Sequence, residues 1–229
     1  MRKALATLGS GRFAALLDVA LPTFRDYASR HAYELRLGTE EDAAGRPLAW
    51  AKVPLLRRLA DRYEVVLWLD ADCVVVDGEC DVAGCLGDEH VHALVRHRTD
   101  EGEVPNTGVW LLRGGAEARE LLGLVWDCED AVEHRWWENA AVCRLLGYET
   151  DPVCRLVAPT PLYRRTRWLP KAWNSIVPDP DPQPRIVHLA GTPFARRRRL
   201  MRAALREAAA PRAGRDRGGA PVTVPAERA

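Results

Sequence analysis

The sequence predicts a single α/β domain, and three observations support this. The chain has 229 residues, of which 47% are hydrophobic, and this is enough apolar material to bury one full core. Its opening alternates strand, helix and strand, the unit from which parallel half-sheets are built. Further along, residues 65–69 are five consecutive apolar residues, typical of a central parallel strand covered on both faces. We therefore expect one domain over residues 1–209 and a disordered tail over residues 210–229.

The strand, helix and strand of the opening unit are predicted by the spacing of apolar side chains and by the glycine and proline residues that interrupt it. Residues 3–8 form an apolar run that predicts the first strand, and Gly9-Ser10-Gly11 marks a turn. Residues 13–31 carry apolar side chains at helical spacing, with an interruption expected near Pro22. Residues 33–37 then alternate like a short strand.

The centre of the chain is built around the apolar run. A helix that begins near Trp50-Ala51-Lys52, with Pro54 in its first turn, leads into it. Residues 90–95 predict another strand. Asn106-Thr107-Gly108 predicts a turn that enters a further strand, because Asn and Gly favour turn conformations.

The C-terminal part alternates helical and extended patterns. We expect two helices, at residues 116–126 and 136–146, followed by short extended pieces at 155–158 and 162–168. A strand over residues 185–192 and a basic helix over residues 196–209 come next. The remaining residues are rich in Pro, Gly, Arg and Ala and cannot build a core, which predicts the disordered tail.

Net charge, the lengths of apolar stretches and the spacing of cysteines exclude several classes of function. The formal net charge of +1 provides no global basic field, so no nucleic-acid partner is expected. No uninterrupted apolar stretch approaches the roughly 18 to 20 residues of a membrane span, and Gly9-Ser10-Gly11 interrupts the N-terminal apolar run before a signal-peptide core forms. The six cysteines lack zinc-ligand spacing. We therefore expect a cytoplasmic protein without a membrane span.

Two carboxylates, Asp70 and Asp72, follow the central apolar strand at alternate positions. In extended backbone they would point the same way, and their repulsion would raise one pKa unless a cation bridges them. Open α/β sheets bind ligands at the carboxyl ends of their strands. The pattern favours a divalent-metal site that holds a phosphorylated ligand, and an acidic turn that only closes the strand is the alternative.

Five motifs occur in a fixed order: Trp50-x-Lys52, Trp68-Leu69-Asp70-Ala71-Asp72, Asn106-Thr107-Gly108, Trp137-Glu138-Asn139-Ala140-Ala141 and His188-x-x-Gly191. Together they resemble GT-A-fold glycosyltransferases, and above all the galactosyl-, mannosyl- and xylosyltransferase family of fungi and plants. A secondary likeness is to the glycogenin-like retaining glycosyltransferases. The resemblance implies a single GT-A (Rossmann-like) domain with a twisted mixed central sheet flanked by helices.

The resemblance also implies a nucleoside diphosphate sugar donor, with its diphosphate held by a divalent metal, Mn²⁺ or Mg²⁺. Asp70, Asp72 and His188 match the metal-binding positions, although a lone histidine on a short strand is more often a core residue. Mn²⁺ accepts carboxylate oxygen and imidazole nitrogen, and neutralising the diphosphate improves the leaving group. Thr7 and Lys52 are assigned to the donor, and a solvated lysine at a helix start is the alternative for Lys52.

The resemblance assigns Glu138 and Asn139 to the donor sugar, with Asn106 nearby. The family carries an acidic residue followed by Gln at the start of this helix, so Glu138-Asn139 is a departure from its pattern. An Asn106 side chain can hydrogen-bond a sugar or acceptor hydroxyl, or only form a turn. Glu138 at a helix N-terminus also favours the helix dipole without any catalytic role.

These assignments predict a glycosyltransferase that moves a sugar to an unidentified acceptor, with retention of anomeric configuration expected from the family. A nucleotidyltransferase acting on a sugar phosphate is one alternative, but the basic glycine-rich loop of that class is only faintly present at residues 9–12. A non-catalytic binding protein with the same fold is the other. The basic run Arg196-Arg197-Arg198-Arg199 either closes over the diphosphate or forms a solvated helix face.

Overall fold

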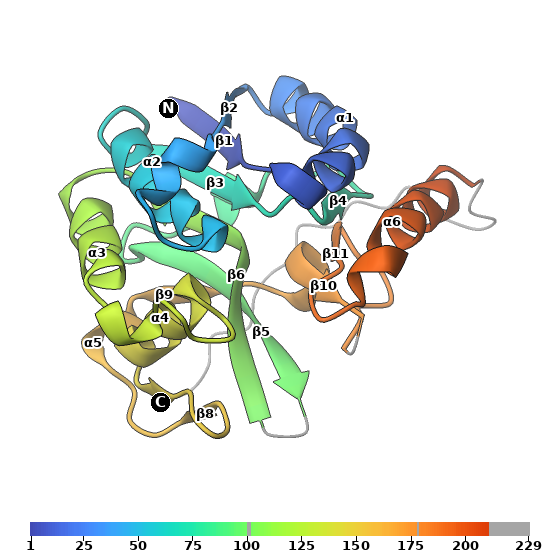
Figure 1. The fold of residues 1–229 in the computed structure, drawn as a ribbon. Coiled ribbons are helices and arrows are strands. Elements are labelled where there is room, and N and C mark those ends of the chain that lie inside the picture. The colour runs from blue at the N-terminus through green and yellow to red at the C-terminus, as the bar shows by residue number, and fades with distance from the viewer. Residues whose placement is uncertain (100–101, 178, 211–229) are drawn as a thin grey trace.

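The computed structural model describes residues 1–99, 102–177 and 179–210. Its centre is a six-stranded sheet with the strand order β2-β1-β3-β6-β5-β9 (Figure 1). These strands are β1 (Lys3–Thr7), β2 (Tyr33–Leu37), β3 (Val65–Leu69), β5 (His92–Thr99), β6 (Gly102–Arg113) and β9 (Thr166–Trp168). β1 is parallel to β2 and β3, whereas β6 is antiparallel to both β3 and β5, and β9 is parallel to β5. The sheet is therefore mixed, with parallel pairing among β2, β1 and β3 at one edge and between β5 and β9 at the other.

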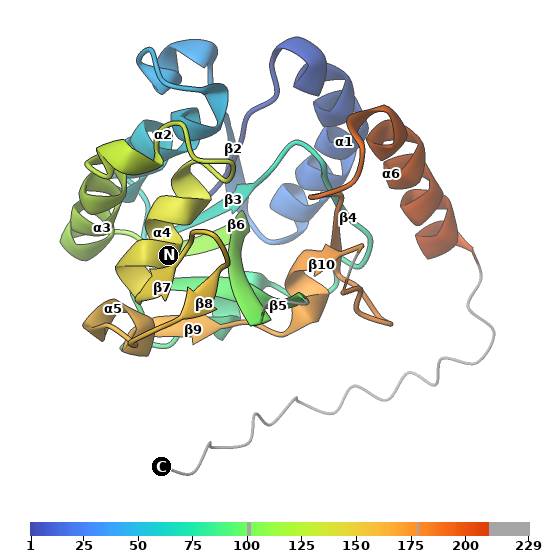
Figure 2. The ribbon, with the colours of Figure 1, turned by 60° about the horizontal axis from the view of Figure 1, so that its bottom comes forward.

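Helices cover both faces of this sheet (Figure 2). They are α1 (Ala14–Arg30), α2 (Lys52–Ala60), α3 (Ala116–Trp126), α4 (Glu138–Leu146), α5 (Pro161–Arg164) and α6 (Phe194–Ala209). Short 3-10 turns join the elements at Gly11–Phe13, Glu40–Ala43, Leu48–Ala51, Val82–Cys85, Glu129–Ala131 and Lys171–Asn174. None of the helices in the described part of the chain is long and apolar enough to cross a membrane.

Alternation along β3 divides the core into two layers. Val66 and Trp68 pack with α2, α3 and α4, whereas Val65, Leu67 and Leu69 pack with α1 and Met201 of α6. All five side chains are buried, because successive strand residues point to opposite faces and both faces are covered. The unbroken apolar run of this strand is the sequence signature of that arrangement.

A second, three-stranded sheet continues from the central one. It consists of β10 (Ser175–Ile176), β11 (Ile186–His188) and β4 (Cys73–Val75), in that order. β11 is antiparallel to β4, and His188 pairs with Cys73. Because β4 follows directly after Asp72, this register brings His188 beside the two aspartates. A separate two-stranded pair is formed by β7 (Tyr148–Glu149) and β8 (Arg155–Leu156).

Several local predictions are wrong in informative ways. Asn106-Thr107-Gly108 lies inside β6, because strand pairing on both sides overrides the turn preference of Asn and Gly. The segment predicted as extended over 162–168 begins as the helical turn α5, whose Pro161 follows the capping Thr160. Helix α1 continues through Pro22.

The ends of two elements also differ from expectation. The helix expected from residue 136 begins at Glu138, since Trp137 has a φ of 48° and cannot join it. The chain does not run straight through Asp70 and Asp72, because a turn separates β3 from β4 and the Cys73 N–H donates to the Asp70 carbonyl at 3.0 Å. Residues 211–229 of the predicted disordered tail lie outside the described residues.

His92 links three neighbouring strands through buried hydrogen bonds. The Trp110 indole donates to Nδ1 of His92 at 3.0 Å, and Nε2 of His92 lies 2.8 Å from Oγ1 of Thr166. An indole N–H can only donate, so Nδ1 is the acceptor and Nε2 carries the proton. Burial, with a smaller contribution from His90, lowers the pKa of His92 from 6.5 to about 3. The ring is therefore neutral in the folded protein at physiological pH.

We expect this histidine to make the fold sensitive to acid. Below a pH of about 6.5 this histidine binds a proton in the unfolded chain, whereas it stays neutral in the folded protein. The free energy of unfolding therefore falls as the pH drops from about 6.5 towards 3, by up to about 1.4 kcal/mol per pH unit for this one group. Urea unfolding at a series of pH values measures the slope. The His92→Gln variant should show a shallower slope, and equal slopes in the two proteins would contradict the assignment.

Candidate functional site

The candidate site lies at the carboxyl end of β3, where the central sheet changes from parallel to antiparallel pairing. Asp70 and Asp72 occupy the turn between β3 and β4. The Asp70 N–H donates to the carbonyl of Gly108 in β6 at 2.8 Å, which ties the turn to the neighbouring strand. Leu189, just after β11, donates its N–H to the Asp72 carbonyl at 3.1 Å. Backbone hydrogen bonds from two sheets thus fix the aspartates.

Two carboxylates and one imidazole converge here. Nε2 of His188 lies 3.3 Å from Oδ1 of Asp72 and 3.8 Å from Oδ2 of Asp70. His188 and Asp72 are only 2% and 4% exposed. Potential ligand atoms of Asp72, Cys73 and His188 all lie within 4.8 Å of one another.

The donor set fits a divalent cation such as Mn²⁺ or Mg²⁺. Burial raises the pKa of Cys73 well above its ordinary value, so its thiol is protonated and is a poor ligand. Its Sγ lies 3.6 Å from the carbonyl of Gly108, as a weak donor. The groups that remain are carboxylate oxygens and one imidazole nitrogen, and this set accepts Mn²⁺.

Arg197 closes the other side of Asp72. Its Nη1 lies 2.7 Å from Oδ2 of Asp72, and its Nε donates to the carbonyl of Thr192 at 2.9 Å. Burial would raise the pKa of Asp72, but His188 and then Arg197 outweigh it and hold the pKa below its ordinary value. Asp72 is therefore ionised. Of the run of four arginines, the other three are exposed on α6, so only Arg197 joins the site.

Lys52 is a buried cation beneath the site. Its side chain is 4% exposed, and its Nζ lies 2.9 Å from Oδ1 of Asp70 and 2.8 Å from Oε1 of Glu138. Burial opposes its charge, but the carboxylates of Asp70 and Glu138 outweigh that effect and raise the pKa of Lys52. The indole of Trp68 also donates to Oδ1 of Asp70, at 2.6 Å. Lys52 thus joins the two acidic groups, and it is not a solvated lysine at a helix start.

Glu138, the first residue of α4, is buried with one free oxygen. Its Oε1 accepts from Lys52 and from Oγ1 of Thr107 at 3.1 Å, whereas its buried Oε2 has no hydrogen-bond partner among the described residues. Burial raises the pKa of Glu138, and the charge of Lys52 counteracts it. The carboxylate is therefore held by one oxygen, and its other oxygen is a buried acceptor without a partner in the part of the chain that the structure describes.

Asn139 and Asn106 bond mainly to the backbone of β6. Oδ1 of Asn139 accepts the Thr107 N–H at 2.8 Å, and its Nδ2 donates to the Pro105 carbonyl at 3.1 Å. Oδ1 of Asn106 accepts the Gly108 N–H at 2.9 Å. Asn139 thus clamps α4 to β6, and both of its polar atoms are engaged.

Thr7 is the last residue of β1, the strand that pairs in parallel with β3. Its Oγ1 is buried and has no hydrogen-bond partner within the described ranges. Of the residues predicted from the sequence, the structure thus brings Asp70, Asp72, His188, Lys52 and Glu138 into direct contact.

Four further residues complete the arrangement: Trp68, Thr107, Asn174 and Arg197. Sequence reasoning assigned none of the first three to the site, and it gave closure over the diphosphate only as one alternative for the whole four-arginine run. Trp68 and Thr107 stand inside motifs whose other members were singled out, so their positions carried a signal. Arg197 was hidden within the four-arginine run. Asn174 precedes β10 and had no distinguishing pattern around it.

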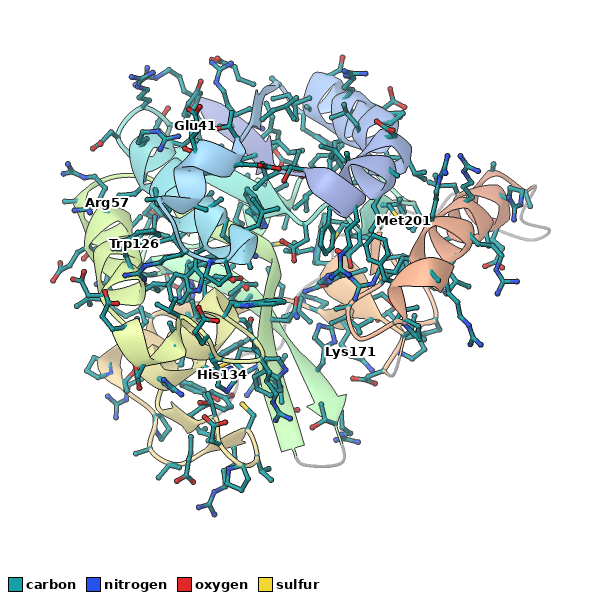
Figure 3. All side chains as sticks on the ribbon, in the orientation of Figure 1. Glu41, Arg57, Trp126, His134, Lys171 and Met201 are labelled. Atoms are coloured by element: carbon teal, nitrogen blue, oxygen red, sulfur yellow. The ribbon has the colours of Figure 1, made fainter. Side chains whose placement is uncertain are left out.

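A surface hollow of about 440 Å³ lies away from these residues, between α2 and α3. Arg57, which lines it, projects on the side of the molecule opposite to Met201 of α6 (Figure 3). Its lining is mostly charged and includes an ion pair of 2.8 Å between Arg119 and Asp61. The hollow is therefore a solvated, charge-paired surface.

Gly108 leaves the space that the His188 ring occupies. A Cβ atom at Gly108 would lie 2.1 Å from Cε1 of His188, far inside van der Waals contact. The Gly108→Ala variant should therefore displace the ring and weaken Mn²⁺ binding by about tenfold or more, as loss of a ligand's supporting contacts does. Calorimetric titration with Mn²⁺ measures this. Gly84→Ala is the matched control, since a Cβ there meets no atom within 4 Å, and equal affinities in both variants would count against the predicted clash.

Comparisons with known proteins identify the fold. No protein-family model and no curated protein sequence matches the chain. Among solved structures, it is similar to a glycosyltransferase involved in the glycosylation of the major capsid of PBCV-1, with a TM-score of 0.64 and 19% identity over 89% of this chain and 100% of that one.

Two further glycosyltransferase structures are also similar. The galactosyltransferase LgtC, in complex with donor and acceptor sugar analogs, has a TM-score of 0.54 and 12% identity, covering 87% of this chain and 95% of its own. GlyE of Streptococcus pneumoniae TIGR4 has a TM-score of 0.56 and 16% identity, covering 90% of this chain and 60% of its own. At these identities the likeness bears on the fold alone. The predicted fold class is confirmed: the chain has the mixed α/β fold of GT-A glycosyltransferase structures.

Proposed function

We propose that this protein is a metal-dependent glycosyltransferase that takes its sugar from a nucleoside diphosphate sugar. The observation that carries the proposal is the convergence of Asp70, Asp72 and His188 at the carboxyl end of β3. Ligands of open α/β sheets bind at this edge. The glycosyltransferase structures that share the fold support the reaction class.

Asp70, Asp72 and His188 would hold the Mn²⁺ or Mg²⁺ ion. When bound, the ion neutralises the donor diphosphate and makes the nucleoside diphosphate a better leaving group. Arg197 adds a fixed positive charge beside Asp72. Thr7, with its unpartnered hydroxyl at the end of β1, remains the proposed contact for the nucleoside side of the donor.

Glu138 is the proposed sugar-facing carboxylate. Its free Oε2 is available to accept from a sugar hydroxyl or to stabilise positive charge that develops on the sugar ring. Lys52 holds the other oxygen and so fixes the carboxylate in position. Asn139 and Asn106 support the strand on which this arrangement rests. Retention of configuration is the outcome that the family resemblance favours, and the acceptor is a hydroxyl or another nucleophile.

The proposal is tested by donor hydrolysis. The protein is incubated with a panel of nucleoside diphosphate sugars and Mn²⁺, and release of the nucleoside diphosphate is followed with and without EDTA. Slow release from one donor that EDTA abolishes would support a transferase. Pyrophosphate exchange into a nucleotide sugar would replace the proposal with a nucleotidyltransferase, and donor binding without turnover, even with acceptors present, would point to a binding protein.

A further inference from the structure

We infer that Asn174 and Asn106 are positioning residues, which together hold the His188 ring with Nδ1 protonated and Nε2 turned towards Asp70 and Asp72. The hydrogen-bond chain that they form starts at a backbone amide in the central sheet and ends at the imidazole in the second sheet. The role of this hydrogen-bond chain in metal binding rests on the proposed function. Its effect on the orientation of the His188 imidazole does not. Neither asparagine needs to contact the donor for this role.

The first link fixes the orientation of Asn106. The backbone N–H of Gly108 lies 2.9 Å from Oδ1 of Asn106. A backbone N–H can only donate, so the side-chain atom facing it must be the amide oxygen and not the amide nitrogen. Nδ2 of Asn174 lies 2.9 Å from the same oxygen and donates to it as well.

The second link transmits this orientation to His188. With its NH₂ group turned to Asn106, Asn174 presents its Oδ1 to Nδ1 of His188, at 2.9 Å. An amide oxygen can only accept, so Nδ1 of His188 carries a proton. Nε2 is then the ring nitrogen that faces the two carboxylates, 3.3 and 3.8 Å away. A cation bound between the three groups would take its nitrogen ligand from this atom, while the other ring nitrogen stays hydrogen-bonded to Asn174.

Packing leaves the imidazole no second orientation. Asn174 is fully buried and His188 is 2% exposed. The ring lies against the backbone of Gly108, where even a methyl group would overlap it. β10 begins at the next residue, Ser175, and pairs with β11, so the sheet register sets where Asn174 meets His188. A ring flip would place a ring carbon against the asparagine oxygen and lose the hydrogen bond.

The matched variants separate this role from simple packing. Asn174→Leu keeps the approximate volume but removes the acceptor of the Nδ1 proton. Asn106→Leu removes the oxygen that orients Asn174, whereas Asn106→Asp keeps an acceptor for both the Gly108 N–H and the Asn174 NH₂ and should keep the wild-type proton position on His188. Ser175→Ala is the neighbouring control, because Oγ of Ser175 accepts from the Asp181 N–H and does not face His188.

The first readout needs no metal. Long-range ¹H–¹⁵N spectra of the metal-free protein, with ¹⁵N-labelled histidine, report which nitrogen of each ring is protonated, and His188→Gln assigns the signals of His188. We expect Nδ1 to carry a proton in the wild type, Ser175→Ala and Asn106→Asp, and a mixture of ring forms, with Nδ1 partly unprotonated, in Asn174→Leu and Asn106→Leu. A wild-type ring protonated at Nε2 alone would overturn the inference.

The second readout is Mn²⁺ affinity by calorimetry. We expect about tenfold to a hundredfold weaker binding in Asn174→Leu and Asn106→Leu, and unchanged binding in Ser175→Ala. Wild-type affinity together with the wild-type proton position in both leucine variants would overturn the inference. If the wild type binds no Mn²⁺, the proposed function fails, but the proton position still decides the inference. Should Asn174→Leu not fold, the contrast between Asn106→Leu and Asn106→Asp provides the same test.

Discussion

Asp72→Asn is expected to abolish turnover of the donor, with a loss of about a thousandfold or more, which corresponds to about 4 kcal/mol of transition-state stabilisation. Asp72 is the more enclosed of the two aspartates proposed to hold the metal, since its side chain is 6% exposed against 29% for Asp70. It also lies within 3.3 Å of His188 and 2.7 Å of Arg197. The amide that Asp72→Asn introduces would offer the cation only a neutral oxygen. The substitution would also remove the negative charge that lies beside His188 and Arg197. Release of nucleoside diphosphate in the presence of Mn²⁺ measures the effect.

The control for this variant is Asp88→Asn, which removes the same charge from a fully exposed position and should leave turnover unchanged. Mn²⁺ binding should be lost in parallel with turnover in Asp72→Asn. If that variant folds and turns over the donor at the wild-type rate, Asp72 has no part in catalysis. Loss of turnover with full Mn²⁺ affinity would instead move the metal to another site.

Lys52→Met is expected to lower the free energy of unfolding by about 3 to 5 kcal/mol, the cost of leaving buried acidic partners without their cation. Lys52 is the buried positive charge that contacts both Asp70 and Glu138, at 2.9 and 2.8 Å. Methionine has a similar length, so the change removes the charge and the hydrogen bonds but little packing. Urea denaturation of the metal-free protein gives the difference.

Two comparisons show whether the loss is electrostatic. Arg58→Ala, on the same helix, breaks the ion pair of a 57% exposed arginine with Asp42 and should cost about 1 kcal/mol or less. The double variant Lys52→Met/Glu138→Gln should be more stable than Lys52→Met alone, because the amide carries no charge to be buried. A Lys52→Met protein as stable as Arg58→Ala would exclude the bridging role.

Local sequence patterns predicted much of the fold. The unbroken apolar run of residues 65–69 fixed a strand buried on both faces, and its two acids marked the end of the sheet where the site lies. The helical stripes of α1, α2 and α3 were equally clear. Such patterns record which side of a local element faces the core, so they predict the element and its buried face.

Contacts between distant segments needed the tertiary structure. The burial of Lys52 between two carboxylates and the choice of Arg197 from four arginines depend on how helices α2 and α6 pack against the sheets. The chain from Asn106 through Asn174 to His188 depends on strand register. A shift of one residue in that register would turn a strand side chain to the opposite face, and no pattern within a single segment records the position of its neighbour. The sequence by itself thus determined the elements and the acidic motif of this protein. Only the packing of its two sheets decided which side chains meet there.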